Sequence, residues 1–267
     1  MHTDTLAAPV ASRPLAPSAP APVQELVSQQ ELLDVLGLFR PQRMADDVKV
    51  RIGGEEDGGY VMPSLALKAQ FVLSIGIGDQ VSFDLDLAQR GAKVLQFDHT
   101  IPGAPAVHDN ICFHRLGWGP QDQGPLRSLR SMVAMADWYN VDHAVLKFDT
   151  EGAEWAALAA CEESDLARFD VIAGEFHALH LLEGRSNLAH VRLVMSKLLR
   201  HHAPVHLHAN NAMTIRQVIG VPVPPLLEVT FVRRDRVRLD GWCTDPIPGP
   251  LDRPNMGDRP DLCLRPF

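Results

Sequence analysis

The sequence predicts an α/β fold, namely a doubly wound, mostly parallel seven-stranded sheet with an antiparallel edge strand. Three observations support this prediction. Short apolar runs alternate with helical segments, polar residues directly follow several of these runs, and no long helical segment separates the last two runs. Strands that are apolar throughout are typical of a parallel sheet whose two faces are both covered by helices.

Two segments precede the predicted sheet. Residues 1–22 are rich in Ala and Pro and lack a basic stretch followed by a continuous apolar run, so we expect a disordered tail and not a secretory signal. Residues 23–70 are expected to form a helix and hairpin extension. Apolar residues recur at helical spacing over 24–38 until Pro41 ends the helix, and turn residues separate two short extended pieces over 51–61.

The main domain is expected to span residues 71–240. Its strands are predicted at 71–75, 93–97, 111–116, 144–148, 170–174, 205–208 and 226–233, and its helices at 82–89, 126–138, 151–160 and 188–201. Because no long helix lies between the last two strands, we expect them to form an antiparallel hairpin at one edge of the sheet. Residues 241–267 are rich in Pro and are expected to lie irregularly over the surface.

The composition limits the classes of function. Of the 267 residues 46% are hydrophobic, which is enough for a substantial core, and the formal net charge of −8 argues against non-specific binding to nucleic acid or to an anionic membrane. No run of about 18 apolar residues is present, so we expect no membrane span and a cytoplasmic location. The four cysteines match no zinc-binding pattern, which predicts reduced thiols. We expect a small-molecule partner, and the sequence leaves a homo-oligomer open.

Chemically useful side chains collect at the carboxyl ends of the predicted strands. The residues at these ends are Gly76, Gly78, Asp98, Asp149, Glu151, Glu175, His177, His208, Asn210 and Asn211. In an open α/β sheet a ligand binds beyond this end of the strands, at the point where the strand order reverses. We therefore expect the functional site there.

The loop after the first strand of the sheet contains Gly76 and Gly78, and glycine lets a ligand approach the backbone closely. A tight strand-to-helix turn explains these glycines equally well. Asp98 lies 20 residues past Gly78 and ends the next strand, where a carboxylate accepts hydrogen bonds from ribose hydroxyls. The combination predicts an adenosine-type ligand. The third glycine of the dinucleotide fingerprint is absent from residues 80–82, so a ligand without a pyrophosphate is favoured.

Several blocks of the chain resemble FkbM-type methyltransferases. They are residues 72–79 (VLSIGIGD), 82–84 (SFD), 96–98 (QFD) and 146–155 (LKFDTEGAEW), the last being the most specific. The chain is most similar to the methyltransferase-like branch of that family. There an Asp-Gly-Gly-aromatic segment lies upstream, here residues 57–60, and a Glu-x-His follows the fifth strand, here residues 175–177. The resemblance covers roughly residues 50–232.

The resemblance implies a Rossmann-like class I methyltransferase fold, S-adenosylmethionine as methyl donor, and mostly O-methylation of sugars or natural-product hydroxyls. By motif match, Gly76 and Gly78 approach the methionine part of the cofactor and Asp98 binds its ribose. The candidate cofactor-binding residues are Gly76, Ile77, Gly78, Asp79, Ser82, Phe83, Asp98, His99, Gly117, Trp118, Asp149, Glu151, Asp57 and Tyr60. His99 departs from the related branch, which commonly has proline after the aspartate.

Two of these assignments have structural alternatives. Trp118 is a candidate for stacking on adenine, or else an aromatic residue of the core. Asp57 and Tyr60 belong to the glycine-rich hairpin, which we expect to act either as a lid over the cofactor or as a simple structural turn.

Methyl transfer to a hydroxyl requires a positioned acceptor and a group that accepts its proton. His177 is the first candidate for the base, because its unperturbed pKa is about 6.5 and it follows the fifth strand. The alternative is a histidine that only hydrogen-bonds the neighbouring loop. Lys147 and His208 are further catalytic candidates, although for Lys147 a structural salt bridge is favoured.

A divalent metal is a second way to lower the pKa of the acceptor. Asp149, Glu175 and His177 follow adjacent strands, and two carboxylates with one imidazole suit Mg²⁺ or another divalent metal. Alternatively, Asp149 and Glu151 bind the amino group of the cofactor or cap the following helix.

The sequence therefore predicts S-adenosylmethionine-dependent O-methylation of a small molecule. A nicotinamide-dependent oxidoreductase is the alternative enzyme class, and the missing third glycine argues against it. A non-catalytic nucleoside-binding domain is the alternative outside enzymes. The presence of Asp149, Glu175 and His177 at the predicted strand ends argues against that interpretation.

Overall fold

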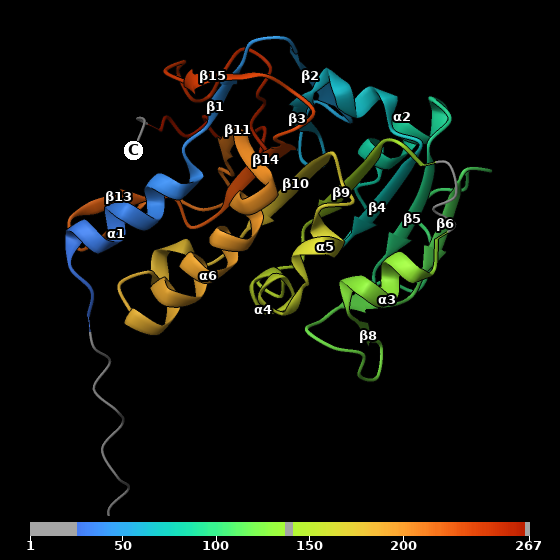
Figure 1. Cartoon of the computed structure of the whole chain (residues 1–267), viewed down its shortest axis with the longest axis horizontal. Coiled ribbons are helices and arrows are strands. Elements are labelled where there is room, and N and C mark those ends of the chain that lie inside the picture. The colour runs from blue at the N-terminus through green and yellow to red at the C-terminus, as the bar shows by residue number, and fades with distance from the viewer. Residues whose placement is uncertain (1–25, 137–140, 265–267) are drawn as a thin grey trace, which may run out of the picture.

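The computed structural model describes residues 26–136 and 141–264 (Figure 1). Its centre is a seven-stranded sheet with the strand order β11-β14-β10-β9-β4-β5-β6. These strands are β4 (Phe71–Ile75), β5 (Lys93–Phe97), β6 (Ile111–His114), β9 (Ala144–Phe148), β10 (Val171–Phe176), β11 (His202–Ala209) and β14 (Leu227–Arg233). The tail predicted over 1–22 lies outside the described residues.

The sheet is mostly parallel, as predicted, and the architecture is a mixed α/β fold of the Rossmann-like kind. The antiparallel hairpin expected of the last two strands is confirmed, because β11 and β14 pair antiparallel at one edge of the sheet. β14 runs antiparallel to both neighbours, β10 and β11, so it lies inside the sheet, and the edge strand β11 runs parallel to β10. β14 is buried over almost its whole length. The edge strand is thus antiparallel to its neighbour, as predicted, and the strand whose direction opposes the other six is β14, one place in from the edge.

Alternate residues of the strands face two separate hydrophobic clusters. Leu73 of β4 belongs to the cluster that packs against α1 (Gln29–Leu36), α3 (Leu129–Ala134), α4 (Glu154–Ala160), α5 (Glu163–Leu166) and α6 (Arg185–His201). Val72 belongs to the other cluster, which packs against α2 (Ser82–Gln89) and the hairpin of β2 (Lys49–Ile52) and β3 (Tyr60–Pro63). Figure 1 shows α4, α5 and α6 together on one face of the sheet.

Three predicted helices are shorter in the structure. The helix predicted over 24–38 is α1, which starts after its cap Ser28 and passes into a 3-10 turn at Gly37–Phe39. The segment predicted as a helix over 126–138 contains a short strand, and α3 starts only after its cap Ser128. Residues 24–25 and 137–138 of these predictions lie outside the described part of the chain.

The helix predicted over 151–160 begins only at Glu154. Glu151 and Gly152 both have positive φ angles, 54° and 100°, which the right-handed helix excludes. These two residues form the turn that links β9 to α4. The turn matters for the site, because it directs Glu151 towards the carboxyl end of the sheet.

Small strand pairs and 3-10 turns complete the fold. The remaining elements are β1 (Gln42–Met44) paired with β15 (Leu239–Trp242), β7 (Gly117–Trp118) paired with β8 (Leu126–Arg127), β12 (Arg216–Val218) paired with β13 (Val221–Val223), and the turns at Ser64–Lys68 and Leu179–Leu181. The sequence pattern did not predict β12 and β13, because three residues are too few to show a periodicity.

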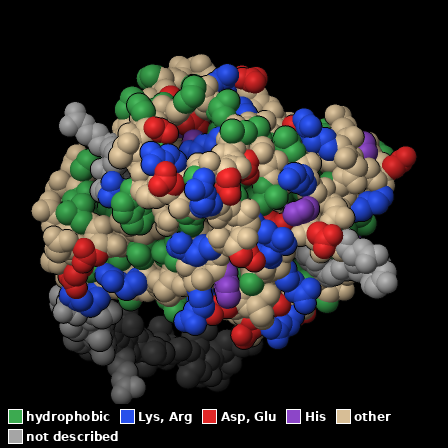
Figure 2. Space-filling view, turned by 45° about the horizontal axis from the view of Figure 1, so that its top comes forward, with side chains coloured by type: hydrophobic (Ala, Val, Ile, Leu, Met, Phe, Trp, Pro, Cys, Tyr) green, Lys and Arg blue, Asp and Glu red, His purple; other side chains and the backbone are tan. Residues whose placement is uncertain are grey.

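The chain after β15 is mostly irregular up to Leu264, as its Pro content predicts. On the face shown in Figure 2, Lys and Arg side chains are interspersed with Asp and Glu and do not gather into one basic patch. None of the helices in the described residues has the length and apolarity to cross a membrane. All four cysteines are free thiols in the structure.

Candidate functional site

A cavity of about 310 Å³ lies at the carboxyl ends of β4, β5 and β9. This is the point where the strand order reverses, because β5 and β6 lie on one side of β4 and β9 and β10 on the other. Most predicted site residues line it, namely Asp57, Tyr60, Gly76, Ile77, Gly78, Asp79, Asp98, His99, Gly117, Trp118, Lys147, Asp149 and Glu151. The structure therefore brings together residues that are spread over more than ninety positions, from 57 to 151.

The glycine turn after β4 forms one wall of the cavity. Gly76 has a φ of 69°, and a Cβ atom there would clash with the backbone carbonyl of Asp149, so only glycine fits. The Gly76 N–H donates to the Phe97 carbonyl at 2.8 Å. The Gly76 carbonyl oxygen accepts a hydrogen bond from Lys147 Nζ at 2.7 Å. Lys147 is buried, and it holds the glycine turn rather than forming the predicted salt bridge.

Asp98 presents a fixed carboxylate to the same cavity. Its Oδ2 accepts a hydrogen bond from the Gly78 N–H at 3.0 Å, and its Oδ1 accepts from the N–H and hydroxyl of Thr100 at 2.8 and 2.6 Å. Burial opposes ionisation of this side chain, but these hydrogen bonds outweigh it and lower the pKa of Asp98 below its ordinary value. The group is therefore an anionic acceptor at the end of β5.

Ser82 and Phe83 were predicted to contact the cofactor, but they do not line the cavity. The Ser82 hydroxyl accepts from the Gly54 N–H at 2.9 Å and donates to the Gly58 carbonyl at 3.2 Å. The ring of Phe83 packs edge-on against Tyr60, with centroids 5.6 Å apart. Both residues thus hold the hairpin against α2, and the hairpin places Asp57 and Tyr60 over the cavity.

Trp118 belongs to the core and lines the cavity as well. It is 3% exposed and its ring packs on Phe148 with centroids 5.3 Å apart. Its indole Nε1 is buried and has no hydrogen-bond partner among the described residues. Since buried donors are almost always paired, this N–H is available to a ligand in the cavity.

His177 lies behind the cavity among four carboxylates. Its Nδ1 is 3.2 Å from Glu154 Oε1, which also accepts the backbone N–H of His177 at 2.9 Å. Its Nε2 lies 3.4 Å from Glu151 and 3.8 Å from both Asp149 and Glu175. Burial opposes protonation, but the hydrogen bond to Glu154 and the surrounding negative charges outweigh it, so the pKa of His177 is raised above its ordinary value.

Glu154 orients His177, and the sequence pattern did not single it out. Its side chain is fully buried in the first turn of α4. Besides His177 it accepts hydrogen bonds from the Gly152 N–H at 2.8 Å and the Thr150 hydroxyl at 3.0 Å. The one signal in the sequence that could have pointed to Glu154 was its place in the block over 146–155. A single glutamate that becomes buried has no characteristic spacing from other residues by which it could be recognised.

The side chains of Asp149, Glu175, Glu228 and His208 form a strand-end row across β9, β10, β14 and β11. Glu175 pairs in register with Glu228, and Glu228 with His208. Burial and the charges of Asp149 and Glu228 raise the pKa of Glu175 well above its ordinary value. Burial also raises the pKa of Asp149, although Lys147 and His177 oppose this shift. The row therefore favours a protonated carboxyl or a bound cation.

The predicted catalytic residue His208 lies at the far end of this row and does not line the cavity. Its Nδ1 is 3.0 Å from Glu228, and its Nε2 is 3.0 Å from Asp261. Both ring nitrogens are thus occupied by carboxylates. Burial opposes protonation, but the interactions with Glu228, Asp252 and Asp261 raise the pKa of His208 to about 9.

One cluster in the described residues has the geometry for a metal ion. It consists of Asp149, Glu151 and His177, whose ligand atoms all lie within 4.8 Å of one another. Two of the three predicted ligands are in this cluster. The third, Glu175, lies beside it and accepts a hydrogen bond from Asn210 at 2.7 Å. The donor set of two carboxylates and an imidazole fits a divalent cation.

No family model matches the chain, and no curated protein matches it, so the resemblance to FkbM-type methyltransferases rests on the motifs alone. Among the solved structures to which the chain has some similarity are the following two. A chain from the crystal structure of a fibrillarin/Nop5p complex has a TM-score of 0.37 and 9% identity, covering 73% of this chain and 98% of that chain. A candidate hemolysin from Streptococcus thermophilus has a TM-score of 0.33 and 13% identity, and the match covers 67% of this chain and 72% of that chain. Neither similarity is high enough to identify a function.

Proposed function

We propose that this chain is an S-adenosylmethionine-dependent methyltransferase with a doubly wound class I fold, and that it methylates a hydroxyl of a small molecule. The observation that carries the proposal is Asp98. Its anionic carboxylate is tied to the Gly78 N–H at 3.0 Å, so a ribose-binding acceptor and the glycine turn share one cavity. The cavity volume of about 310 Å³ lies within the range of small-molecule sites, about 300–1,000 Å³.

The charges around the cavity favour a nucleoside that carries a positive charge and no phosphates. Lys147 is the only Lys or Arg among the described residues that line it, and its ammonium group already donates to Gly76. A pyrophosphate would therefore meet few cations. Asp149 and Glu151 suit the amino group and the sulfonium of S-adenosylmethionine instead, and the Trp118 N–H adds an unpaired donor.

When bound, S-adenosylmethionine supplies an activated methyl group, so the protein has to orient the acceptor and accept its proton. In this proposal His177 is the base. Glu154 holds its Nδ1, which leaves Nε2 directed towards Asp149 and Glu151 at the rim of the cavity. Because the carboxylates raise the pKa of His177, the neutral base forms at a higher pH than for an ordinary histidine.

A divalent metal is the second way in which this site can activate a hydroxyl. Asp149, Glu151 and His177 would hold the ion, and its charge would offset the repulsion among the carboxylates that surround His177. In that case His177 would be a ligand rather than the base, and a bound cation would supply the lowered pKa of the acceptor hydroxyl.

The experiment that tests the proposal is a calorimetric titration of the purified protein with S-adenosylhomocysteine. It is carried out after EDTA treatment, and again with added Mg²⁺ or Mn²⁺. NAD is titrated as the competing ligand. We expect binding in the micromolar range for S-adenosylhomocysteine and none for NAD.

Each outcome has a definite meaning. Micromolar binding supports the cofactor assignment, and heat that depends on the metal favours a metal at Asp149, Glu151 and His177. Tight binding of NAD with no binding of S-adenosylhomocysteine would overturn the proposal in favour of an oxidoreductase. Cofactor binding without turnover of any hydroxyl acceptor would indicate a non-catalytic nucleoside-binding domain.

A further inference from the structure

The chain after β15 is fastened by its side chains to β11 and to the loop of the β2–β3 hairpin. Asp252 lies 2.7 Å from His206 Nε2, and Asp261 lies 3.0 Å from His208 Nε2. Arg253 forms an ion pair of 2.6 Å with Glu55 of the hairpin loop. This C-terminal segment, residues 243–264, is therefore part of the packed structure although it is mostly irregular.

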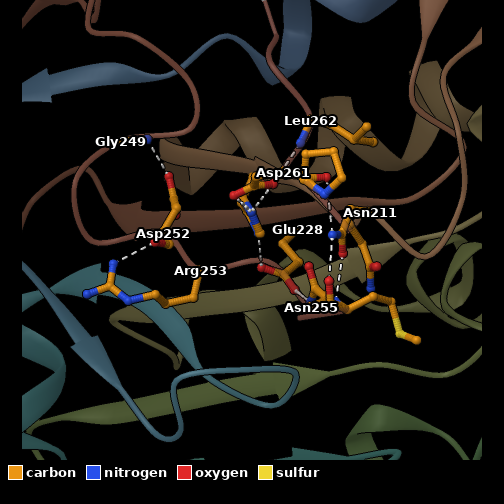
Figure 3. Close-up of polar contacts among 12 residues, drawn as sticks. Asn211, Glu228, Gly249, Asp252, Arg253, Asn255, Asp261 and Leu262 are labelled. Atoms are coloured by element: carbon orange, nitrogen blue, oxygen red, sulfur yellow. Dashed lines mark hydrogen bonds and ion pairs between the residues drawn. The ribbon is translucent and has the colours of Figure 1, made fainter. Parts of the chain in front are cut away.

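Asn255 of the C-terminal segment bridges two carboxylates. Its Nδ2 donates to Glu228 Oε1 at 2.6 Å and to Asp57 Oδ1 at 3.2 Å, which uses both of its N–H bonds. Asp57 lines the cavity, whereas Glu228 belongs to the strand-end row. Figure 3 shows Asn255 and Asp261 on opposite sides of Glu228.

Glu228 is a rigid anchor for this bridge. It lies on β14, which is paired on both sides, and its Oε2 is held by His208 Nδ1 at 3.0 Å. Asn255 itself is 7% exposed. Asp57, by contrast, is exposed, and among the described residues the hydrogen bond from Asn255 is the one that fixes its carboxylate.

The backbone of the hairpin loop has supports of its own. Arg51 donates to the carbonyls of Gly54 and Glu56 at 2.7 and 2.9 Å, and Ser82 bonds to Gly54 and Gly58. Loss of Asn255 should therefore free the Asp57 side chain without unfolding the loop. This separation makes a specific effect of Asn255 measurable.

We propose that Asn255 is a positioning residue of the cofactor site, which holds the Asp57 carboxylate at the rim of the cavity and so makes the C-terminal segment part of that site. A neutral amide is suited to this place because it donates to two carboxylates that would otherwise repel each other. The inference rests on the proposed function, since it assigns Asp57 to the cofactor.

A double-mutant cycle tests the inference. The affinity for S-adenosylhomocysteine is measured by calorimetry for the wild type, Asn255→Ala, Asp57→Ala and the double variant. The matched control is Asn187→Ala on α6, whose half-buried side chain donates to the Leu181 carbonyl and lies far from this network in the sequence. The thermal midpoint of each protein without ligand reports whether it is folded, and Asn255→Ser takes the place of an Ala variant that does not fold.

We expect Asn255→Ala to weaken binding about three- to tenfold in the native background, consistent with one lost hydrogen bond, and Asn187→Ala to leave it unchanged. In the Asp57→Ala background, which has no acceptor for Asn255, the same substitution should have no further effect, because Asn255 acts through Asp57. Additive losses in the two backgrounds, or an unchanged affinity in the single variant, would overturn the inference while leaving the cofactor assignment intact. A wild type that does not bind S-adenosylhomocysteine would instead overturn the proposed function, and the inference with it.

Discussion

At the scale of single residues, Asp98 is the side chain on which the cofactor assignment depends most. It is 5% exposed, yet three hydrogen bonds from Gly78 and Thr100 keep it ionised. A carboxylate held in this way is preorganised to accept hydrogen bonds from a ligand, because no side-chain freedom is lost on binding. Its removal should therefore reduce the affinity more than an ordinary surface substitution does.

We predict that Asp98→Ala weakens binding of S-adenosylhomocysteine by about 1.5–3 kcal/mol, the usual contribution of a hydrogen bond to a charged group. Isothermal titration calorimetry measures the change. Asp34→Ala on the exposed face of α1 is the control and should bind as the wild type does. An unchanged affinity in Asp98→Ala would show that the ribose lies elsewhere.

The sequence predicted single residues well where the strand pattern determines their position. Asp98, Gly76 and Asp149 follow strands with clear apolar runs, so their meeting at one edge could be inferred before the structure. Glu154 and His208 could not be placed in this way. The contact of Glu154 depends on a turn with two positive φ angles, and that of His208 depends on β14 and on Asp261, 53 residues away.

At the scale of secondary structure, α1 shows how local signals fix a boundary. Ser28 accepts the N–H of Glu31 at 3.2 Å, and Glu31 accepts the N–H of Ser28 at 2.8 Å, which is a complete capping box. Glu31 also pairs with Arg185 of α6 at 3.1 Å. The first turn of α1 is thus stabilised both locally and through its packing partner.

We predict that Ser28→Ala lowers the free energy of unfolding by about 1 kcal/mol, because an orphan N–H of the first turn loses its acceptor. Urea denaturation monitored by circular dichroism measures this change. Ser28→Thr retains the hydroxyl and should lose much less stability. Equal losses in the two variants would show that the cap contributes little.

The four elements at 71–75, 82–89, 93–97 and 144–148 have the boundaries that the sequence predicted. Each is either an apolar run or an amphipathic helix bounded by Gly, Asp or charged residues. The segment over 126–138 was predicted poorly, because its apolar residues fit a helix from Leu126 onward. The structure instead uses Leu126 and Arg127 to pair with Gly117 and Trp118, a tertiary contact that no local pattern contains.

At the scale of the whole molecule, two buried histidines have opposite effects on the way in which the free energy of unfolding changes with pH. Burial lowers the pKa of His202 to about 4, whereas the carboxylates around His208 raise its pKa to about 9 against the effect of burial. The stabilisation from neutral His202 is complete above the unfolded-state pKa, about 6.5, and is lost as the pH falls towards 4. The stabilisation from charged His208 is complete below about 6.5 and is lost as the pH rises towards 9.

We therefore predict that these two residues together favour maximal stability near pH 6.5, each contributing up to about 3 kcal/mol. Urea denaturation between pH 5 and 9 measures the profile. His208→Gln should flatten the limb above about pH 6.5 and leave the limb below it almost unchanged, and His202→Gln should do the reverse. An alkaline limb that is equally steep in His208→Gln would contradict the assignment.

The position of β14 inside the sheet has a consequence for the order of folding. β10 and β11 precede β14 in the chain but are separated by it in the sheet, so they cannot complete their pairing until residue 233 has been synthesised. A nascent chain that ends before β14 leaves the facing edges of β10 and β11 open, and open edges of apolar strands are prone to aggregation. On the ribosome, the last strand of the seven-stranded sheet to emerge is thus the one that joins β11 to β10, and the interval between Ala209 and Leu227 is the period in which a chaperone would be of most use.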